Sequence, residues 1–427
     1  MRKDWSGRTF FMIELNDFVR EAGCRAVRHW LRVNNNVSGR GGLKMKRLGN
    51  LWSVIPSVIT GSVLALAIPG VAIQASGFPE IGPLPVKEVP KESLAKMGQR
   101  LFFDVRVSGD GAISCATCHD PAQGFTRQTD KEGKPMALSD AYPGTRHFRN
   151  APTLINVVYK ADFADTGWGW DGHMGANLND VLRDQITESM MMNMDMRLMH
   201  ERMKQDPVYV QMCQDNFNGE CSSGKGRKAL VAFLQTLVSR DVPFDNDSLS
   251  GEAQLGRLLF EGKANCVSCH NGPYFSDGLP HNTGVPENLE IFNDPLRHIA
   301  YRAVITNHGV PKADIWRRDV GYFLVSKDYR DVGSFITPTL REVVHTAPYM
   351  HNGMLQTLEE VVEFYTAGGG HDDPLATDLK PLDLNGTEQA QLVAFLRSLS
   401  SPVVPTAQKV AIPLEYEPID DWLDVKN

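Results

Sequence analysis

Apolar residues recur at helical spacing along most of the chain. In residues 91–104 three apolar side chains fall on one helical face, and residues 252–260 repeat this arrangement. Further stretches with a helical period cover residues 178–203, 230–238, 357–365 and 388–399. Strand-like alternation of apolar and polar residues is scarce. The pattern therefore predicts a mainly α protein with long loops.

The first helical segment and the segment at 252–260 lead into the same short motif. In each case a glycine-bearing turn follows and ends in C-x-x-C-H, as CATCH from Cys115 to His119 and as CVSCH from Cys266 to His270. Because helix, turn and motif recur in the same order, the chain contains an internal repeat.

The C-x-x-C-H spacing is that of c-type haem attachment. Two thiols can form thioethers with one haem while the adjacent histidine supplies an axial nitrogen to the iron. A four-cysteine zinc site is disfavoured, because the chain has no spare C-x-x-C to complete it. His119 and His270 are therefore the expected proximal ligands. Four cysteines are expected to carry two haems: Cys115 and Cys118 the first, and Cys266 and Cys269 the second.

The first 76 residues differ from the rest of the chain. Basic residues at positions 44, 46 and 47 precede an apolar run from Leu51 to Ile68, and small residues follow. This order is typical of a secretory signal peptide, with cleavage expected after Ala72 or Ala75. The run is shorter than the span of about 20 apolar residues that a membrane helix needs. We expect a periplasmic protein with no membrane anchor after cleavage.

Charge narrows the range of partners. The whole chain carries −7, and residues 1–75 carry 11 Lys and Arg against 4 Asp and Glu, so losing their +7 would leave −14. An acidic body argues against nucleic acid and anionic lipid as ligands. It favours a basic protein partner, although a solvated acidic surface is the commoner cause of such a balance. The oxidising periplasm also suits a disulfide between Cys213 and Cys221.

After the leader, nearly the whole chain resembles the bacterial dihaem cytochrome c peroxidase and MauG family, in its MauG/MbnH-like subgroup. The likeness lies in LFFDVRVSGDGAISCATCH, RNAPTLIN, WDG, GKANCVSCHNGPYFSD and TPTLREVVHTAPYMHNGMLQTLEEVVEFY. The resemblance implies two cytochrome c-like haem domains packed together. The expected organisation is a leader and signal peptide over 1–76, a peroxidatic haem domain over 77–245, an electron-transfer haem domain over 246–402, and a tail over 403–427.

The resemblance also implies a distal ligand for the second haem. Classical members have a methionine fourteen residues after the histidine of TAPYxH, whereas MauG-like proteins have a tyrosine there. Counted from His351, this position is Tyr365. A phenolate is a hard oxygen donor that favours ferric and higher states. Without the family register, a tyrosine packed in the core would be the better interpretation, and Met350 and Met354 are rival ligands.

The resemblance assigns Trp170 to the position between the haems, where an easily oxidised indole can carry a hole. Packing in a glycine-rich turn is compatible with that role, and Trp168 is the near alternative. MauG has a surface tryptophan two residues before its second haem motif, but this chain has Ala264 there. A different exit for oxidising equivalents, such as Trp316 or Tyr322, would be required.

A calcium site between the haems is also implied. Asn150, with the carbonyls of Thr346 and Pro348, matches that site, and oxygen donors of this kind suit Ca²⁺. A lone asparagine would otherwise be a turn residue. His351 matches a haem-adjacent histidine, which we expect to form hydrogen bonds rather than to bind iron.

The distal side of the first haem departs from the family pattern. Relatives read WDGR, but this chain has His173 in place of the arginine. The usual proton-handling glutamate of an E-M pair aligns with Met191, and the following methionine aligns with Met192. Glu188 and Gln185 are possible substitutes for the glutamate.

Several methionines surround this position, and three interpretations apply. The cluster from Met190 to Met196 could be a pliable lining of the haem pocket, which we favour, a sacrificial antioxidant set, or a soft Cu(I) site. The remaining histidines are expected on surfaces or in loops: His147, His200, His281, His298, His308 and His371.

The sequence therefore predicts a periplasmic dihaem oxidase that depends on hydrogen peroxide. The first haem would cleave peroxide, and a high-valent, bis-Fe(IV)-type state spread through Trp170 and stabilised by Tyr365 would oxidise tryptophan in a partner protein. One alternative is a dihaem cytochrome c peroxidase that takes electrons from a small cytochrome or cupredoxin. Another is a non-enzymatic dihaem electron carrier.

Overall fold

The computed structural model describes residues 77–128, 146–163, 166–370, 373, 375–376 and 379–404. The chain divides into two units, Met1–Ile73 and Gln74–Asn427, and every described residue belongs to the second. The expected leader over 1–76 and residues 405–427 of the expected tail lie outside the described residues.

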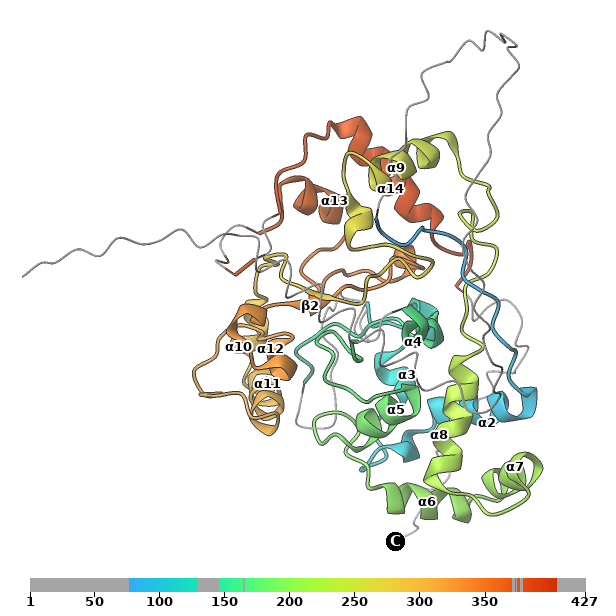
Figure 1. Cartoon of the computed structure of the whole chain (residues 1–427). Coiled ribbons are helices and arrows are strands. Elements are labelled where there is room, and N and C mark those ends of the chain that lie inside the picture. Colours follow the sequence, from blue (N-terminus) through green and yellow to red (C-terminus); the bar gives the residue numbers. More distant parts are fainter. Residues whose placement is uncertain are drawn as a thin grey trace, which may run out of the picture. The chain divides into compact units, whose positions relative to one another are not determined.

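Helices make up most of the regular structure of the second unit (Figure 1). They are α2 (Glu92–Phe103), α3 (Cys115–Cys118), α4 (Lys160–Phe163), α5 (Leu178–Thr187), α6 (Met196–Gln205), α7 (Pro207–Phe217), α8 (Ser223–Leu234), α9 (Gly251–Glu261), α10 (Leu289–Asn293), α11 (Pro295–Asn307), α12 (Phe323–Ser326), α13 (Leu358–Thr366) and α14 (Gly386–Ser398). Strands β1 (Pro280–His281) and β2 (Phe335–Ile336) pair antiparallel, with Pro280 opposite Ile336. The predicted mainly α class is confirmed.

Two crossing helix pairs organise the unit, α2 with α8 and α9 with α14. Each pair has a glycine at its crossing. A Cβ atom on Gly98 would lie 1.9 Å from the carbonyl oxygen of Ala229, and one on Gly256 would lie 1.9 Å from that of Gln391. Because any other side chain would collide with the partner backbone, both pairs depend on glycine for their close approach.

Phenylalanine rings pack against one another at each crossing. The ring centroid of Phe102 lies 5.1 Å from that of Phe233 and 5.8 Å from that of Phe125. Tilted and edge contacts of this kind are the favoured arrangements of aromatic rings. The equivalent distances at the second crossing are 5.1 Å for Phe260 to Phe395 and 6.1 Å for Phe260 to Phe275. The internal repeat of the sequence is therefore also a repeat in packing.

Residues 79–82, ahead of the first helix, form a strap across the second helix pair's core. The carbonyl of Pro79 accepts the backbone N–H of Gly272 at 3.1 Å. The carbonyl of Gly82 accepts a hydrogen bond of 2.7 Å from the buried guanidinium of Arg341. The first described residues of the chain are thus held by residues of its second half.

The predicted helical stretch over 178–203 is broken into two helices. α5 ends at Thr187 and α6 begins at Met196. Asn193 has φ of 47°, in the left-handed region that interrupts a right-handed helix. The side chain of Asp195 then accepts the backbone N–H of Arg197 at 2.7 Å and starts α6 afresh. The apolar period continues across the break, and for this reason the sequence pattern missed it.

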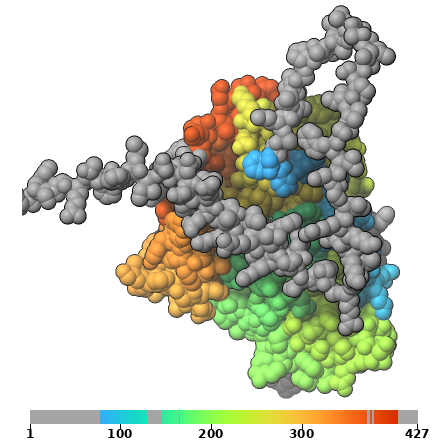
Figure 2. Space-filling view, in the orientation of Figure 1, coloured from blue at the N-terminus to red at the C-terminus, as the bar shows by residue number. Residues whose placement is uncertain are grey.

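A third apolar cluster lies apart from the two helix pairs. Residues of α10, α11 and α12 build it together with Phe148. In the space-filling view these helices form the orange surface at one side of the described unit (Figure 2). α11 therefore has one face in a core and another at the surface.

Candidate haem and inter-haem sites

The two predicted haem motifs share one local geometry. The Nδ1 atom of His119 lies 3.0 Å from the carbonyl oxygen of Phe125, and the Nδ1 atom of His270 lies 3.1 Å from that of Phe275. Because a carbonyl oxygen only accepts hydrogen bonds, each Nδ1 carries the proton and each Nε2 is left as a ligand atom. Metal-binding histidines are commonly oriented in this way.

The residues around both histidines suit a bound haem. Phe125 and Phe275 have φ of 56° and 54°, values that a bulky residue rarely adopts. Their rings are the ones that fill the helix crossings, so packing holds both carbonyls in place. Burial lowers the pKa of His119 and of His270, which favours the neutral imidazole that binds iron. Both motifs therefore fit a c-type haem.

Tyr365 lies on α13 beside the second haem motif. The pKa of its phenol is raised to about 12, mainly by burial. A hydrogen bond with Thr283 opposes this rise, and the nearby Cys269 and Cys266 contribute to it. The structure thus brings Tyr365 next to the cysteines that would attach the second haem. The rival ligand Met354 has 39% of its surface exposed.

Asn150 joins the predicted inter-haem residues. Its carbonyl oxygen accepts the indole N–H of Trp170 at 2.8 Å, and its own backbone N–H donates to the carbonyl of His351 at 2.7 Å. Its side-chain Nδ2 donates to the carbonyl of Pro348 at 2.6 Å. Trp168 lies in the same turn and is 6% exposed. Three segments far apart in the sequence therefore meet at one asparagine.

Two buried atoms at this meeting point have no hydrogen-bond partner among the described residues. They are Oδ1 of Asn150 and Nε2 of His351. An unpaired buried oxygen close to the Pro348 carbonyl is the kind of donor that Ca²⁺ takes, and Thr346 lies half-buried in the same loop. The oxygen donors present therefore fit the expected calcium ion.

A buried ion network adjoins the same point. Arg149 forms two contacts of 2.7 Å with the carboxylate of Asp319 and one of 2.7 Å with that of Asp171. Asp171 is also bonded to Nδ1 of His173, the residue at which the chain departs from the family pattern. Buried charges persist only when paired in this way. The network ties the WDG turn to residue 319. Arg149 opens the RNAPTLIN motif, but no role was predicted for it, and no sequence pattern included Asp319.

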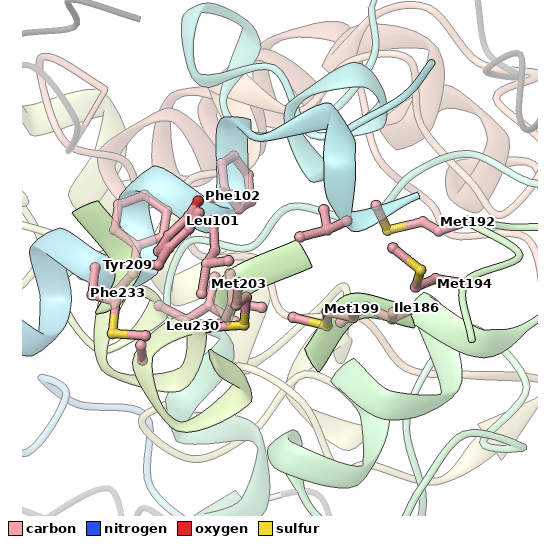
Figure 3. Packing of buried hydrophobic residues seen from close by; sticks show 14 of the residues in the cluster. Leu101, Phe102, Ile186, Met192, Met194, Met199, Met203, Tyr209, Leu230 and Phe233 are labelled. Atoms are coloured by element: carbon pink, nitrogen blue, oxygen red, sulfur yellow. The ribbon is translucent and has the colours of Figure 1, made fainter. Parts of the chain in front are cut away.

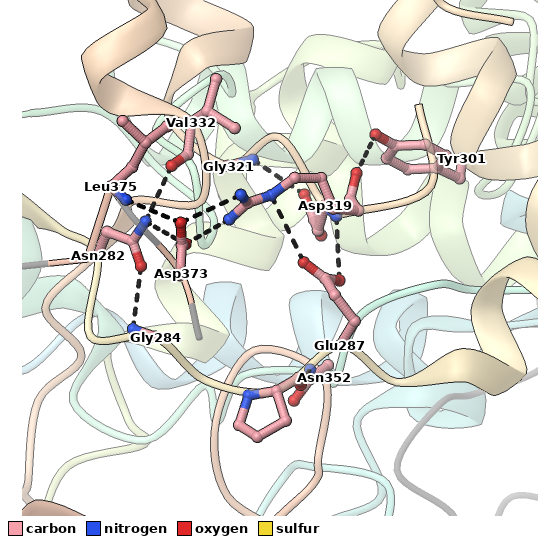
Figure 4. Close-up of polar contacts among 12 residues, drawn as sticks. Asn282, Gly284, Glu287, Tyr301, Asp319, Gly321, Val332, Asn352, Asp373 and Leu375 are labelled. Carbon is pink, nitrogen blue, oxygen red and sulfur yellow. Dashed lines mark hydrogen bonds and ion pairs between the residues drawn. The ribbon is translucent and has the colours of Figure 1, made fainter. Parts of the chain in front are cut away.

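The network extends from Asp319 to Glu287 (Figure 4). The Glu287 carboxylate accepts the backbone N–H of Asp319 at 3.1 Å. Burial raises the pKa of Glu287 to about 7, and the nearby carboxylate of Asp319 adds to this effect. Glu287 is therefore a carboxyl group with a pKa near neutrality. Beside it, Arg318 contacts Asp373 at 2.5 Å.

Three methionines of the 190–196 cluster, Met192, Met194 and Met196, lie in or against the first core (Figure 3), whereas Met190 packs against the third cluster. Met192 and Met194 are 7% and 2% exposed and belong to the same apolar cluster as Met199 and Met203. Cys115 of the first haem motif packs against this cluster. Flexible thioethers buried beside the motif are what the pocket-lining interpretation requires.

The candidate proton-handling residues stand at the break between α5 and α6. Oε1 of Glu188 accepts hydrogen bonds from Oγ of Ser189 at 3.1 Å and from the backbone N–H of Met190 at 3.4 Å. Met191 is half-buried in the same turn. Nε2 of Gln185 lies 2.9 Å from Sδ of Met174. In this conformation the Glu188 carboxylate faces its own turn.

His147, which was expected to lie on a surface or in a loop, lies near the first haem motif. It is half-buried, and burial lowers its pKa to about 4. The nearby charge of His119 is the second cause of this lowered pKa, so the two imidazoles lie near each other. The charges of Arg297 and Arg149 lower the pKa of His147 further. No helical spacing relates His147 to another ligand, so no pattern could reveal this proximity. His371 lies outside the described residues.

The structure also describes the cysteine pair, the candidate exit residues and the apolar character of the helices. The predicted disulfide between Cys213 and Cys221 is present. Ala264 is buried, whereas Trp316 and Tyr322 are half-buried, and the indole N–H of Trp316 donates to the carbonyl of Pro311 at 3.0 Å. Within the described ranges, no helix has the length and apolar character needed to cross a membrane.

Comparison with known proteins gives consistent matches. A family model described as di-haem cytochrome c peroxidase matches residues 92–254. Cytochrome-c peroxidase IdrP2 of Denitromonas iodatirespirans is 43% identical over 344 residues, which cover 78% of this chain and 88% of that protein. Methylamine utilization protein MauG of Methylorubrum extorquens is 31% identical over 331 residues, covering 76% of this chain and 82% of that protein.

Solved structures agree at the level of the fold. A MauG-like protein associated with microbial copper homeostasis superposes with a TM-score of 0.61 at 24% identity. The match covers 80% of this chain and 99% of that chain. At this identity the likeness supports the architecture alone.

Proposed function

The chain belongs to the di-haem cytochrome c peroxidase family, as its motifs predicted, and on this premise we propose that it reduces hydrogen peroxide with electrons from a partner protein. Because it belongs to this family, the protein is a haem peroxidase-type oxidoreductase, and two c-type haems are implied. Two relatives at 43% and 44% identity are named cytochrome-c peroxidases, whereas the MauG proteins are 31% and 28% identical. The names therefore favour peroxide reduction over tryptophan oxidation.

The observation that carries the proposal is the inequality of the two motifs. Near the first motif the core offers soft, movable methionines, of which Met192 is one, while Tyr365 stands beside the second. A haem with a free distal side can admit peroxide, and a haem closed by a protein ligand is suited to electron transfer. When bound, the haems supply the redox chemistry.

The chain's own groups orient and connect the two centres. Neutral His119 and His270 are aimed by the Phe125 and Phe275 carbonyls. The Asn150 carbonyl accepts the indole N–H of Trp170, and we propose that this tryptophan connects the two haems. We propose that a calcium ion on Asn150, Thr346 and Pro348 holds this junction rigid, and that the unpartnered Nε2 of His351 forms a hydrogen bond with a group bound nearby.

Proton handling at the first haem is assigned to Glu188. Peroxide cleavage needs a group that accepts and returns a proton. Glu188 is the nearest carboxylate in sequence to Met191, which occupies the usual glutamate position. A rotation of the Glu188 side chain away from the Met190 N–H would free it for this role.

Oxidation of tryptophan in a partner protein is the second candidate function. Tyr365 favours it, because a hard phenolate donor stabilises oxidised iron better than methionine does. In this case the two oxidising equivalents would leave as holes through an aromatic exit. We place either activity in the periplasm, in line with the expected signal peptide.

Steady-state and spectroscopic measurements separate these possibilities. Rapid peroxide consumption with a reduced small cytochrome, after prereduction of the second haem, supports the proposed peroxidase. A long-lived state two equivalents above the resting protein, formed with peroxide alone, supports tryptophan oxidation instead. If both haems are six-coordinate by electron paramagnetic resonance and neither responds to peroxide, both proposals are wrong.

A further inference from the structure

We propose that the outer face of α11, with the loop at 311–317, is a docking surface for an acidic protein partner. The inference rests on the proposed function, because that function requires a protein to deliver electrons. The surface, here called the α11 face, consists of Leu296, Ile299, Arg302, Ile315 and Arg317.

The α11 face exposes large apolar side chains. Ile299 and Ile315 are 58% and 64% exposed, and Leu296 is 39% exposed. The opposite side of α11 is buried in the third cluster, so the helix is held firmly from behind. Exposed apolar residues that gather on one surface mark interaction sites. The orange surface of Figure 2 includes this helix.

Positive charge accompanies these apolar residues. Nε2 of His298 lies 3.3 Å from Nη1 of Arg317. Burial is the largest cause that lowers the pKa of His298, and the charges of Arg317 and Arg302 lower it further. The three groups are therefore neighbours. No carboxylate within the described ranges pairs with Arg302 or Arg317. By contrast, the buried Arg297 on the same helix is paired with Glu290.

This local charge has the opposite sign to the molecule as a whole. The chain carries −7, and −14 once the expected leader is removed. The unpaired arginines attract an acidic partner at one place, and the acidic remainder of the surface repels it elsewhere. Together these forces fix the orientation of the partner. A basic partner would be drawn to the remaining surface and not to the α11 face.

The inner side of α11 leads toward the inter-haem junction. Tyr301 is fully buried, and its ring centroid lies 5.4 Å from that of Phe148. Phe148 is two residues before Asn150, whose carbonyl holds the indole of Trp170. A partner on the α11 face would therefore rest on the core that adjoins Trp170.

The test compares charge-reversed holoproteins in equilibrium binding. The probe is a reduced acidic plastocyanin, titrated without peroxide at low and at high salt. Arg302→Glu with Arg317→Glu should weaken binding at low salt at least about tenfold and remove most of its salt dependence. Ile299→Ala with Ile315→Ala should weaken binding while keeping the salt dependence. The matched control, Lys96→Glu with Lys228→Glu, makes the same charge change on α2 and α8 and should keep the affinity within about twofold.

Equal affinity of plastocyanin for the wild type and the arginine variant would overturn the proposal. So would tighter binding of a basic mitochondrial-type cytochrome c that the arginine changes leave unaltered. The response of the haems to peroxide is recorded separately, without any partner. A variant that loses plastocyanin but keeps this response supports the docking surface. Haems that ignore peroxide while plastocyanin still binds would refute the proposed function alone.

Discussion

Trp170 donates its indole N–H to the backbone carbonyl oxygen of Asn150 across 2.8 Å. A peptide carbonyl accepts hydrogen bonds but is too weak a base to remove a proton. The Asn150 carbonyl would therefore not take the proton of an indole oxidised in this position. The same hydrogen bond fixes the ring relative to the loop of His351 and Pro348, which Asn150 also contacts.

Replacing Trp170 with phenylalanine should slow electron exchange between the haems. The substitution keeps an aromatic ring but removes the oxidisable indole and leaves the Asn150 carbonyl without its donor. We expect a rate at least about tenfold lower, equivalent to about 1.4 kcal/mol of barrier, in stopped-flow mixing of peroxide with the half-reduced protein. Trp168→Phe, in the same turn, is the control and should leave the rate nearly unchanged.

Replacing Tyr365 with methionine should raise the reduction potential of the second haem. Methionine stabilises ferrous iron, whereas a phenolate stabilises ferric iron. The expected shift is on the order of 0.1 V, within the range of ~0.8 V over which axial ligands set haem potentials. Spectroelectrochemical titration measures it. Tyr349→Phe is the control, and a second-haem potential that stays the same in Tyr365→Met would refute the ligand assignment.

Adding one methyl group at either helix crossing should destabilise the fold. In Gly98→Ala and Gly256→Ala the new Cβ would meet a carbonyl oxygen at 1.9 Å, so the helices must separate. Overpacking of this kind costs about 1–3 kcal/mol or more in the free energy of unfolding. Gly251→Ala, also on α9, has nothing within 4 Å of its Cβ and serves as the control in urea denaturation.

Removing the charge of Glu287 should change the pH dependence of stability. Its pKa is raised from 4.5 to about 7, so the folded protein binds a proton more tightly than the unfolded chain does. The free energy of unfolding must then fall as pH rises through this interval. Glu287→Gln keeps an acceptor for the Asp319 N–H and should flatten the decline. Denaturation midpoints at pH 5 and pH 8 test this, and parallel profiles for both proteins would contradict it.

Truncating Asn150 should weaken calcium binding. Asn150→Ala removes the unpaired buried Oδ1, which is one of the oxygen donors proposed for the ion. Titration of chelator-treated holoprotein with Ca²⁺ should show an affinity at least about tenfold lower than in the wild type. Asn216→Ala, which removes an amide bonded to Ser93 on α2, is the control. No calcium uptake by the wild type would refute the site.

The parts of the molecule that the sequence predicts well are those set by local chemistry. C-x-x-C-H identifies the haem positions because thioether bonds and the adjacent ligand require that spacing. The helix containing Tyr365 follows from its own period and begins at the Thr357 cap, whose hydroxyl accepts the Glu360 N–H. Such features need no knowledge of the rest of the chain.

The parts that could not be predicted depend on distant partners. Arg149 belongs to the RNAPTLIN motif, but nothing in the sequence pairs it with Asp319, which is 170 residues away and outside every motif. His147 gives no sign of its proximity to His119 because the approach is made by folding and not by spacing. The break before Asp195 was hidden because apolar residues on both sides of it face the same core.

Because of the strap at residues 79–82, the residues of the first core lie, in sequence, between two sets of residues that build the second core. The α2–α8 pair is complete by Leu234, but the core around α9 and α14 needs residues that come both before α2 and after it. Closing a contact over a longer loop costs more chain entropy, so the inner core should form first during folding. Mutations that slow the first core would then also delay the second, whereas mutations confined to the second would leave the first unaffected. The order in which the chain folds would thus follow from where its first few described residues bind.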